Sequence, residues 1–275
     1  MPRISIDSLD DPRVRMYRDL KTNNSLRDGK LFIAEGSKLV ERLLASDFRV
    51  ASILVAERRA EEWAGQVPDD VPLYIIPQQV GEQLTGFNFH VGVLACGHRK
   101  PTRLLNEALP PLNPQTAPAP LTLVLCPNCD NPENLGAIIR IGAAFGIDAL
   151  LLSRDGCCDP FSRRVLRVSM GTAFRLPIIE SSDLERDVKR LRDEWQVELI
   201  ATVLDESAEP LSLSARGNRV GLLFGNEADG LDARWRSLCH RQVTIPMHGG
   251  TDSLNVAIAA GIFLHHFAKS DTSAR

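Results

Sequence analysis

The chain has no excess of basic charge and no long hydrophobic run. Its 275 residues hold 32 Lys and Arg against 35 Asp and Glu, so any nucleic-acid site must be a local basic patch. The longest apolar run, residues 254–264, is far too short to span a bilayer. The N-terminal stretch MPRISIDSLDDPRVRMY has no apolar core, and we therefore expect no signal peptide. With 44% hydrophobic and 24% charged residues, the composition is that of a globular protein, which we expect in the cytoplasm.

The familiar signatures of nucleotide-binding and hydrolytic enzymes are also missing. No G-x-G-x-x-G follows an expected strand, and no G-x-x-x-x-G-K-[ST] occurs. The G-x-S-x-G of α/β-hydrolases is absent too. These absences disfavour a Rossmann dehydrogenase, a P-loop NTPase and a serine hydrolase.

Cysteine is present, but without a spacing that indicates disulfides or zinc. The six residues are Cys96, Cys126, Cys129, Cys157, Cys158 and Cys239. Cys126-Pro-Asn-Cys129 looks like half of a zinc knuckle, yet adjacent cysteines such as Cys157 and Cys158 are poor co-ligands for one tetrahedral ion. No histidine spacing completes such a site. We expect free thiols in a reducing compartment and no bound metal.

The distribution of apolar runs predicts two α/β modules. Residues 1–100, with a core at about 28–100, alternate short strand-like and helix-like segments. Residues 101–118 are rich in proline and alanine and read as a linker, with a short helix at residues 104–108. From residue 119 to 275, near-continuous apolar strands alternate with helices, which indicates a mostly parallel sheet covered on both faces.

One expected helix of the second module carries a single arginine in an apolar body. In residues 131–148, NPENLGAIIRIGAAFGID, Asn131 is a good N-cap and Gly146 is placed to end the helix. Arg140 lies at the rim of the buried face, and Asn134 lies in the first turn. Arg140 can be an arginine whose stem packs while its head reaches water, or an arginine with a polar partner or a task.

Two further segments place polar residues where expected strands end, which is where open α/β sheets hold their sites. In LLFGNEADGL, Gly225 and Glu227 follow a hydrophobic strand; the alternative is an ordinary polar turn with Glu227 solvated. In IPMHGGTDSLNVAIAAGIF, Ser253 and Asn255 flank Leu254 at the entrance of an apolar helix. The small residues of that helix permit close packing.

These motifs resemble those of the SpoU/TrmH family of RNA ribose 2′-O-methyltransferases, within the SPOUT class. The likeness rests on N-x-x-x-x-x-R from Asn134 to Arg140, G-N-E ending at Glu227, and I-P-M followed by S-L-N within residues 245–255. The motifs occur in the family's order over roughly residues 119–270. In the first module, IAEGSKLVERLL and FHVGVLACGHR are similar to the L30e-like RNA substrate-binding domain that precedes the catalytic domain in many members.

The resemblance implies a parallel α/β domain with a C-terminal trefoil knot, a bent S-adenosyl-L-methionine cofactor and a homodimer. Carried over by position, the cofactor contacts are Gly225, Ile245 and Leu254, with Phe224 and Met247 as neighbours and Thr202 as a weaker candidate. The polar catalytic set is Asn134, Arg140, Glu227, Ser253 and Asn255. The cysteine pair before Asn131 departs from the family pattern, and we assign it no role.

The resemblance makes Arg140 the base for the ribose hydroxyl, although arginine is effectively always protonated. Arg140 therefore either has a strongly lowered pKa, passes the proton to an RNA phosphate, or clamps that phosphate. A second basic group suits phosphates: Arg163, Arg164, Arg167 and Arg175 stand beside only one acid in the sequence. The alternative for it is a salt-bridged surface turn. Weaker candidates in the first module are Arg27, Lys30 and Lys38.

We therefore expect a two-domain enzyme that methylates a ribose 2′-hydroxyl in structured RNA, and the two-domain layout favours rRNA. Three alternatives stay open: a tRNA ribose methyltransferase, a base methyltransferase of the same knotted class, and a non-catalytic RNA-binding protein with this fold.

Overall fold

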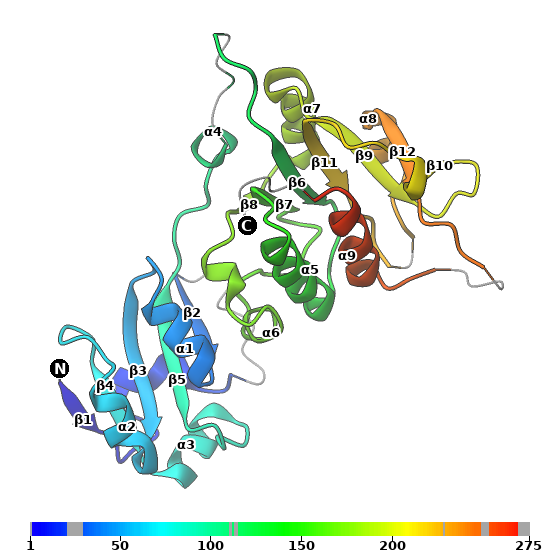
Figure 1. Ribbon diagram of the computed structural model, residues 1–275. Helices are drawn as coiled ribbons and strands as arrows, with labels where there is room; N and C mark the ends of the chain where they lie inside the picture. The colour runs from blue at the N-terminus through cyan, green and yellow to red at the C-terminus, as the bar shows by residue number, and fades with distance from the viewer. Residues whose placement is uncertain are drawn as a thin grey trace, which may run out of the picture. The chain divides into compact units, whose positions relative to one another are not determined.

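The computed structural model describes residues 2–20, 30–109, 112, 115–227, 229–248 and 253–268. The chain divides into two compact units (Figure 1). Unit 1 comprises Met1–Pro101 together with Phe161–Arg175, and unit 2 comprises Thr102–Pro160 with Leu176–Arg275. The division differs in one place from the expected one, because the segment 161–175 lies within the second module in sequence but packs with the first.

Unit 1 is built on a five-stranded sheet of order β1-β4-β3-β5-β2. Its elements are β1 (Arg3–Ser5), η1 (Pro12–Tyr17), β2 (Leu31–Glu35), α1 (Ser37–Leu44), β3 (Val50–Ala56), η3 (Glu57–Arg59), α2 (Ala60–Ala64), β4 (Leu73–Ile76), α3 (Gln78–Thr85), β5 (Val93–His98), α6 (Arg163–Val168) and η4 (Thr172–Phe174). Strand β5 runs antiparallel to both β2 and β3, so this sheet is mixed. The buried strand β3 and its neighbours follow the apolar runs of the sequence.

Unit 2 contains a seven-stranded sheet of order β10-β12-β9-β11-β6-β7-β8. Its elements are α4 (Leu105–Ala108), β6 (Leu121–Cys126), α5 (Pro132–Ala144), β7 (Ala149–Ser153), β8 (Ile178–Ser181), α7 (Leu184–Trp195), β9 (Glu198–Val203), β10 (Glu209–Pro210), η5 (Leu211–Leu213), β11 (Arg219–Leu223), α8 (Ala233–Leu238), β12 (Arg241–Thr244) and α9 (Val256–His266). All pairings between these strands are parallel, which confirms the expected parallel sheet.

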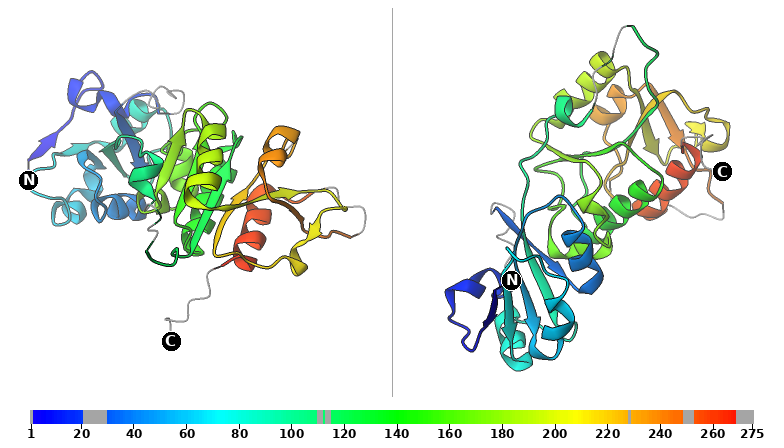
Figure 2. Two further views of the ribbon diagram at one scale, coloured as in Figure 1. Left: turned by 90° about the horizontal axis from the view of Figure 1, so that it is seen from above. Right: turned by 60° about the vertical axis from the view of Figure 1, so that its left-hand side comes forward.

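Helices cover both faces of the unit 2 sheet, which explains why its central strands are buried throughout. Alternate residues of β6, such as Leu123 and Leu125, join a core with Leu184, Val188 and Leu191 of α7. On the other face, α5 and α9 lie side by side (Figures 1 and 2). All seven strands end at one edge in the same direction, so the loops that follow β6, β9, β11 and β12 gather there.

Candidate active site

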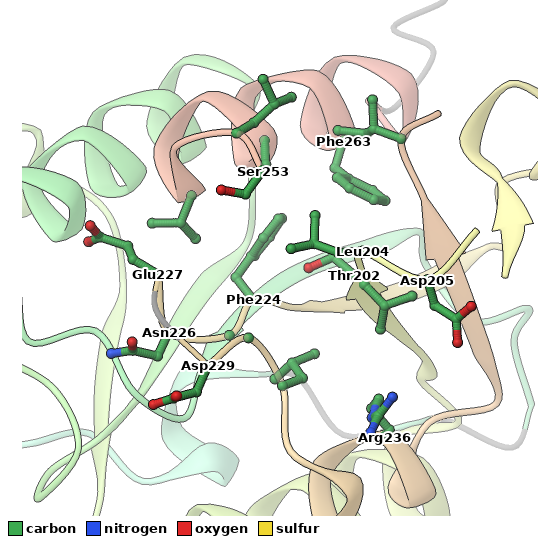
Figure 3. Close-up of a pocket in the computed structure, with 18 of the residues that line it drawn as sticks. Thr202, Leu204, Asp205, Phe224, Asn226, Glu227, Asp229, Arg236, Ser253 and Phe263 are labelled. Atoms are coloured by element: carbon green, nitrogen blue, oxygen red, sulfur yellow. The ribbon is translucent and has the colours of Figure 1, made fainter. Parts of the chain in front are cut away.

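A pocket of about 410 Å³ lies where strands β9, β11 and β12 end and α9 begins (Figure 3). Its lining includes all six residues that the sequence assigned to a cofactor: Thr202, Phe224, Gly225, Ile245, Met247 and Leu254. Two members of the expected catalytic set, Glu227 and Ser253, also line it. The volume falls within the range of small-molecule sites. Segments more than 50 residues apart in sequence thus converge on one cavity.

Hydrogen bonds at the ends of the strands hold the floor of the pocket. The hydroxyl of Thr202 donates to the carbonyl of Leu223 at 2.8 Å, which ties the end of β9 to the end of β11. The backbone N–H of Phe224 donates to the carbonyl of Leu125 at 3.0 Å and continues the parallel ladder by one residue. Phe224 is 1% exposed and meets Phe263 of α9 edge to face, with 5.9 Å between ring centroids.

Gly225 is required by the protein's own backbone. A Cβ atom at this position would lie 2.1 Å from the carbonyl carbon of Gly230, which no side chain can tolerate. Asn226 and Gly230 exchange backbone hydrogen bonds of 3.1 and 2.9 Å across this turn. The glycine therefore closes the turn that presents Glu227 at the side of the pocket.

A chain of amide hydrogen bonds joins three residues of the expected catalytic set. The side-chain amide of Asn134 donates to a carboxylate oxygen of Glu227, and the Asn134 side-chain oxygen accepts from Nδ2 of Asn255 at 2.9 Å. Asn134 is 6% exposed, so these two bonds satisfy a buried polar group. Ser253 lies on the opposite side of Phe224 from the turn residue Asp229 (Figure 3).

The orientation of each amide follows from helix geometry. Asn255 is the N-cap of α9, and its side-chain oxygen accepts from the backbone N–H of Ala257 at 2.9 Å and of Ile258 at 3.3 Å. Because the oxygen is occupied by the helix, only Nδ2 is left to point at Asn134. Asn134 in turn must direct its own Nδ2 at Glu227. The cap of α9 thereby fixes the donor and acceptor of each hydrogen bond from Asn255 through Asn134 to Glu227.

Arg140 lies apart from this cluster. It is an exposed residue of α5, six positions after Asn134, which is about 9 Å along the helix axis. Within the described parts of the chain, its guanidinium makes no hydrogen bond or ion pair, and it does not line the pocket. The side chain is therefore available to a ligand that approaches α5 from solvent.

The four arginines assigned to RNA belong to unit 1. Arg163 donates to Glu35 at 2.9 Å and its guanidinium lies 4.3 Å from the centroid of the Phe87 ring. Arg164, Arg167 and Arg175 are exposed. Lys30 and Lys38 are exposed as well, whereas Arg27 lies outside the described residues.

The cysteines near the site are buried. The backbones of Cys129 and Cys157 pair in an isolated parallel β-bridge, with no disulfide between the two side chains. The backbone N–H of Cys129 donates to the carbonyl of Gly156 at 3.0 Å. Burial raises the pKa of the Cys126 and Cys129 thiols well above the usual range. Within the described ranges, no group of three or more His, Cys, Asp or Glu side chains is arranged to hold a metal ion.

Several pocket residues had no signal in the sequence. Phe263 is one apolar residue in an apolar helix, and nothing local distinguishes it from the core. Asp205 is an exception, because a carboxylate two residues after the end of strand β9 is a recognisable candidate for a site at the strand ends. Arg236 belongs to the short helix α8, which the sequence analysis did not predict. Both charged groups lie on the side of the pocket away from Glu227 (Figure 3).

Comparisons with known proteins agree with this arrangement. The model of the SpoU rRNA Methylase family matches residues 121–265, and that of the MRM3-like substrate binding domain matches residues 11–95. An uncharacterized tRNA/rRNA methyltransferase of Mycobacterium bovis is 34% identical over 272 residues, which is 95% of this chain and 90% of that protein. The 23S rRNA (guanosine(2553)-2′-O)-methyltransferase RlmP of Bacillus subtilis is 27% identical, over 95% and 98% of the two chains.

A solved structure has a similar fold over nearly the whole chain. The crystal structure of an AdoMet-bound rRNA methyltransferase from Sinorhizobium meliloti aligns with a TM-score of 0.77 and 27% identity, covering 96% of this chain and 97% of that one. The α/β fold and the family that the sequence motifs predicted are both confirmed. This chain belongs to the SpoU rRNA Methylase family.

Proposed function

We propose that this protein transfers a methyl group from S-adenosyl-L-methionine to a ribose 2′-hydroxyl of ribosomal RNA. The observation that carries the proposal is the hydrogen-bonded set of Asn134, Glu227 and Asn255 beside a pocket of cofactor size in a SpoU family member. The similar proteins named above support it, because one is a 23S rRNA 2′-O-methyltransferase and another binds AdoMet.

The pocket fits this cofactor by shape and by charge. Apolar side chains such as Phe224, Leu254 and Phe263 suit a purine, while Asp205, Glu227 and Asp229 supply negative charge for a cationic ligand. The residues that would hold the cofactor are Thr202, Phe224, Gly225, Ile245, Met247 and Leu254. When bound, S-adenosylmethionine supplies a methyl group already activated on a sulfonium, so the protein mainly has to position the acceptor.

The side chains of this protein have two tasks toward the acceptor ribose. Asn134, Glu227, Ser253 and Asn255 present amide, carboxylate and hydroxyl groups that can hold ribose hydroxyls by hydrogen bonds. The buried bonds of Asn134 keep Asn134, Glu227 and Asn255 in one geometry before RNA arrives. Preorganised polar groups of this kind cost no rearrangement during the reaction.

Arg140 engages the nucleotide that is methylated. Its exposed guanidinium suits a phosphate, which it can bind through two parallel N–H donors. The same residue serves as base only if the 2′-hydroxyl proton passes to it or through it to the phosphate. We assign Arg140 the role of phosphate clamp: it stays protonated, and the 2′-hydroxyl proton passes to the phosphate that it holds as the methyl group is transferred.

Unit 1 holds the RNA. We assign residues 1–100 to an L30e-like substrate-binding domain, residues 101–118 to the linker and residues 119–275 to the methyltransferase domain; the family matches at 11–95 and 121–265 support these limits. Arg164, Arg167 and Arg175 contact phosphates, and Arg163 takes part from its anchored position beside Glu35.

The methyltransferase domain forms a homodimer and its C-terminal part is threaded into a trefoil knot. Support for the dimer comes from α9, where Ile258 and Ile262 are 56% and 39% exposed on a helix that is apolar up to its last two residues. No described helix is long and apolar enough to span a membrane. We place the protein in the cytoplasm, together with its proposed ribosomal RNA substrate.

The test is methyl transfer to unmodified RNA. Purified protein is incubated with labelled S-adenosylmethionine and separate pools of unmodified 23S rRNA, 16S rRNA and tRNA, and the digested nucleosides are identified by mass spectrometry. A 2′-O-methylated nucleoside from rRNA is the expected product. Label in tRNA alone would replace rRNA as the substrate, a base-methylated nucleoside would replace the reaction, and RNA binding without any transfer would favour a binding protein.

A further inference from the structure

The segment 161–175 is anchored in unit 1 by aromatic packing. Phe161 and Phe174 pack against Phe32 and Phe48, and ring centroids in this cluster are 5.6–5.7 Å apart. Gly97 makes room for the cluster, since a Cβ atom there would lie 2.4 Å from the Phe32 ring. The segment is therefore a fixed part of the surface of unit 1.

Helix α1 runs beside this segment. The guanidinium of Arg42 donates to the backbone carbonyl of Met170, and a Cβ atom on Gly171 would lie 2.7 Å from Cδ1 of Leu39. Gly171 has a φ of +76°, so the turn after α6 is shaped to pass close to α1. Both figures of the whole chain show α1 and α6 next to each other (Figures 1 and 2).

The exposed side chains of these neighbouring segments are mostly cationic. On α1, Lys38 and Arg42 lie one helical turn apart on the solvent side, because Leu39, Val40 and Leu43 take the buried side. The segment 161–175 has four arginines and no acid. In the described structure, the guanidinium of Arg175 and the side chains of Lys38 and Arg42 form no ion pair with a carboxylate.

Few carboxylates lie in these segments, and one that lies beside them, Glu35, is already paired with arginines. Glu35 lies at the end of β2, has a 10% exposed side chain, and pairs with Arg163 at 2.9 Å and with Arg167 at 4.0 Å. Glu41 is exposed on α1 and is the single acidic residue of α1 and the segment 161–175. Counting α1, the segment 161–175 and Glu35, six cationic side chains stand beside two carboxylates, in a chain whose overall charge is −3.

We propose that Lys38 and Arg42 of α1 join Arg164, Arg167 and Arg175 in one RNA-binding surface, here called the α1–α6 ridge. Its occupant is the phosphate backbone of structured RNA, because closely spaced guanidinium and ammonium groups bind phosphates in register and release their counterions. The inference rests on the proposed function for the identity of the RNA. It adds that the docking surface combines two segments more than 120 residues apart in sequence.

The ridge predicts a specific change in the salt dependence of RNA binding. We would measure the Kd of the full chain for an unmodified 23S rRNA transcript between about 50 and 200 mM KCl. Lys38→Gln with Arg42→Gln should weaken binding roughly tenfold and lower the slope of log Kd against log[salt] by about two, since each lost phosphate contact removes about one unit. Glu41→Gln, on the same helix, should change binding in the opposite direction.

Controls separate charge from folding and from cofactor binding. Arg190→Gln with Arg192→Gln, on α7 of unit 2, removes the same charge elsewhere and should leave the slope unchanged. Lys38→Arg with Arg42→Lys keeps both charges and should keep the wild-type slope even if the Arg42 bond to Met170 is weakened. S-adenosylhomocysteine binding by calorimetry should be equal in all variants.

Each outcome bears on one proposal. A wild-type slope in the Lys38→Gln, Arg42→Gln protein would overturn the ridge while leaving the methyl-transfer proposal intact. A slope that falls equally in the α7 control would also overturn it, because the effect would then come from net charge. Absence of methyl transfer by the wild-type protein would overturn the proposed function, while the salt slopes would still decide whether the ridge binds RNA.

Discussion

At the scale of residues, Asn255 makes two kinds of hydrogen bond whose effects can be measured separately. Its oxygen caps α9 and its nitrogen donates to Asn134. Asn255→Asp keeps an oxygen at the cap, where a carboxylate is favourable, so the free energy of unfolding should stay within about 0.5 kcal/mol of the wild type. The lost donor leaves the Asn134 oxygen facing a carboxylate, and methyl transfer should fall about 100-fold.

Single-turnover transfer and chemical denaturation measure these two effects. Asn255→Ala serves as the comparison, because it removes the cap as well and should cost about 1 kcal/mol of stability. Transfer near the wild-type rate in Asn255→Asp would show that the amide chain to Glu227 is not needed for the reaction.

Arg140 provides the second test at this scale. Arg140→Lys keeps the positive charge and loses the planar pair of donors, so a residue that clamps a phosphate should lose transfer activity by about tenfold or more. Binding of S-adenosylhomocysteine should not change, because Arg140 does not line the pocket. Activity equal to that of the wild type would reject a specific role for this guanidinium.

At the scale of elements, the sequence predicted most of the framework that positions the site. Helix α5 begins directly after its expected N-cap, Asn131, and strand β11 directly precedes the glycine turn as expected, because both are strongly patterned segments. The short elements α6, α8 and β8 were not predicted, since four to six residues carry little periodicity; α4, equally short, does lie within the helix expected at residues 104–108. Their positions depend on tertiary contacts instead.

The loop that leads into α5 depends on one glycine. A Cβ atom on Gly156 would lie 2.1 Å from the backbone carbonyl oxygen of Pro127, while Cys129 donates its N–H to the Gly156 carbonyl. Gly156→Ala should therefore cost about 1–3 kcal/mol of stability by overpacking. It should also lower transfer activity, because the displaced loop precedes Asn134 by only a few residues.

Gly65→Ala is the matched control for thermal denaturation of that variant. Its Cβ atom would meet nothing within 4 Å, and its φ of −88° suits any residue. The melting temperature should stay unchanged or rise slightly. Equal melting temperatures of both alanine variants would mean that the backbone at Pro127 moves away from the added methyl group without loss of stability.

Helix α9 gives the prediction for assembly. Ile258→Asp with Ile262→Asp places charge on its exposed apolar face, and if that face is the dimer interface the protein should sediment as a monomer. Sedimentation velocity of the wild type and of the variant at equal concentration makes the comparison. A wild-type protein that is monomeric, or a variant that remains dimeric, contradicts the assignment of this face.

At the scale of the whole molecule, local pattern could not reveal where the segment 161–175 packs. The two-module division and the linker follow from composition, and the pocket follows from three motifs at strand ends. Arg163 and Glu35 are 128 positions apart in sequence, and neither local segment contains a pattern that predicts their contact. Phe161 and Phe174 had no predicted partners for the same reason.

Because the segment 161–175 packs within unit 1, a chain that lacks residues 1–101 loses the packing partners of this segment. A fragment of residues 102–275 would contain every catalytic candidate but would lack Phe32 and Phe48, leaving Phe161 and Phe174 without their partners. Each aromatic side chain that loses its burial forfeits roughly 1.5–3 kcal/mol. We expect the fragment to aggregate, and size-exclusion chromatography with S-adenosylhomocysteine binding measures this. Phe161→Ser with Phe174→Ser should restore a soluble, cofactor-binding fragment, because the pocket itself lies wholly within unit 2. An unmodified fragment that is already monodisperse would show that exposure of the two phenylalanines does not drive aggregation.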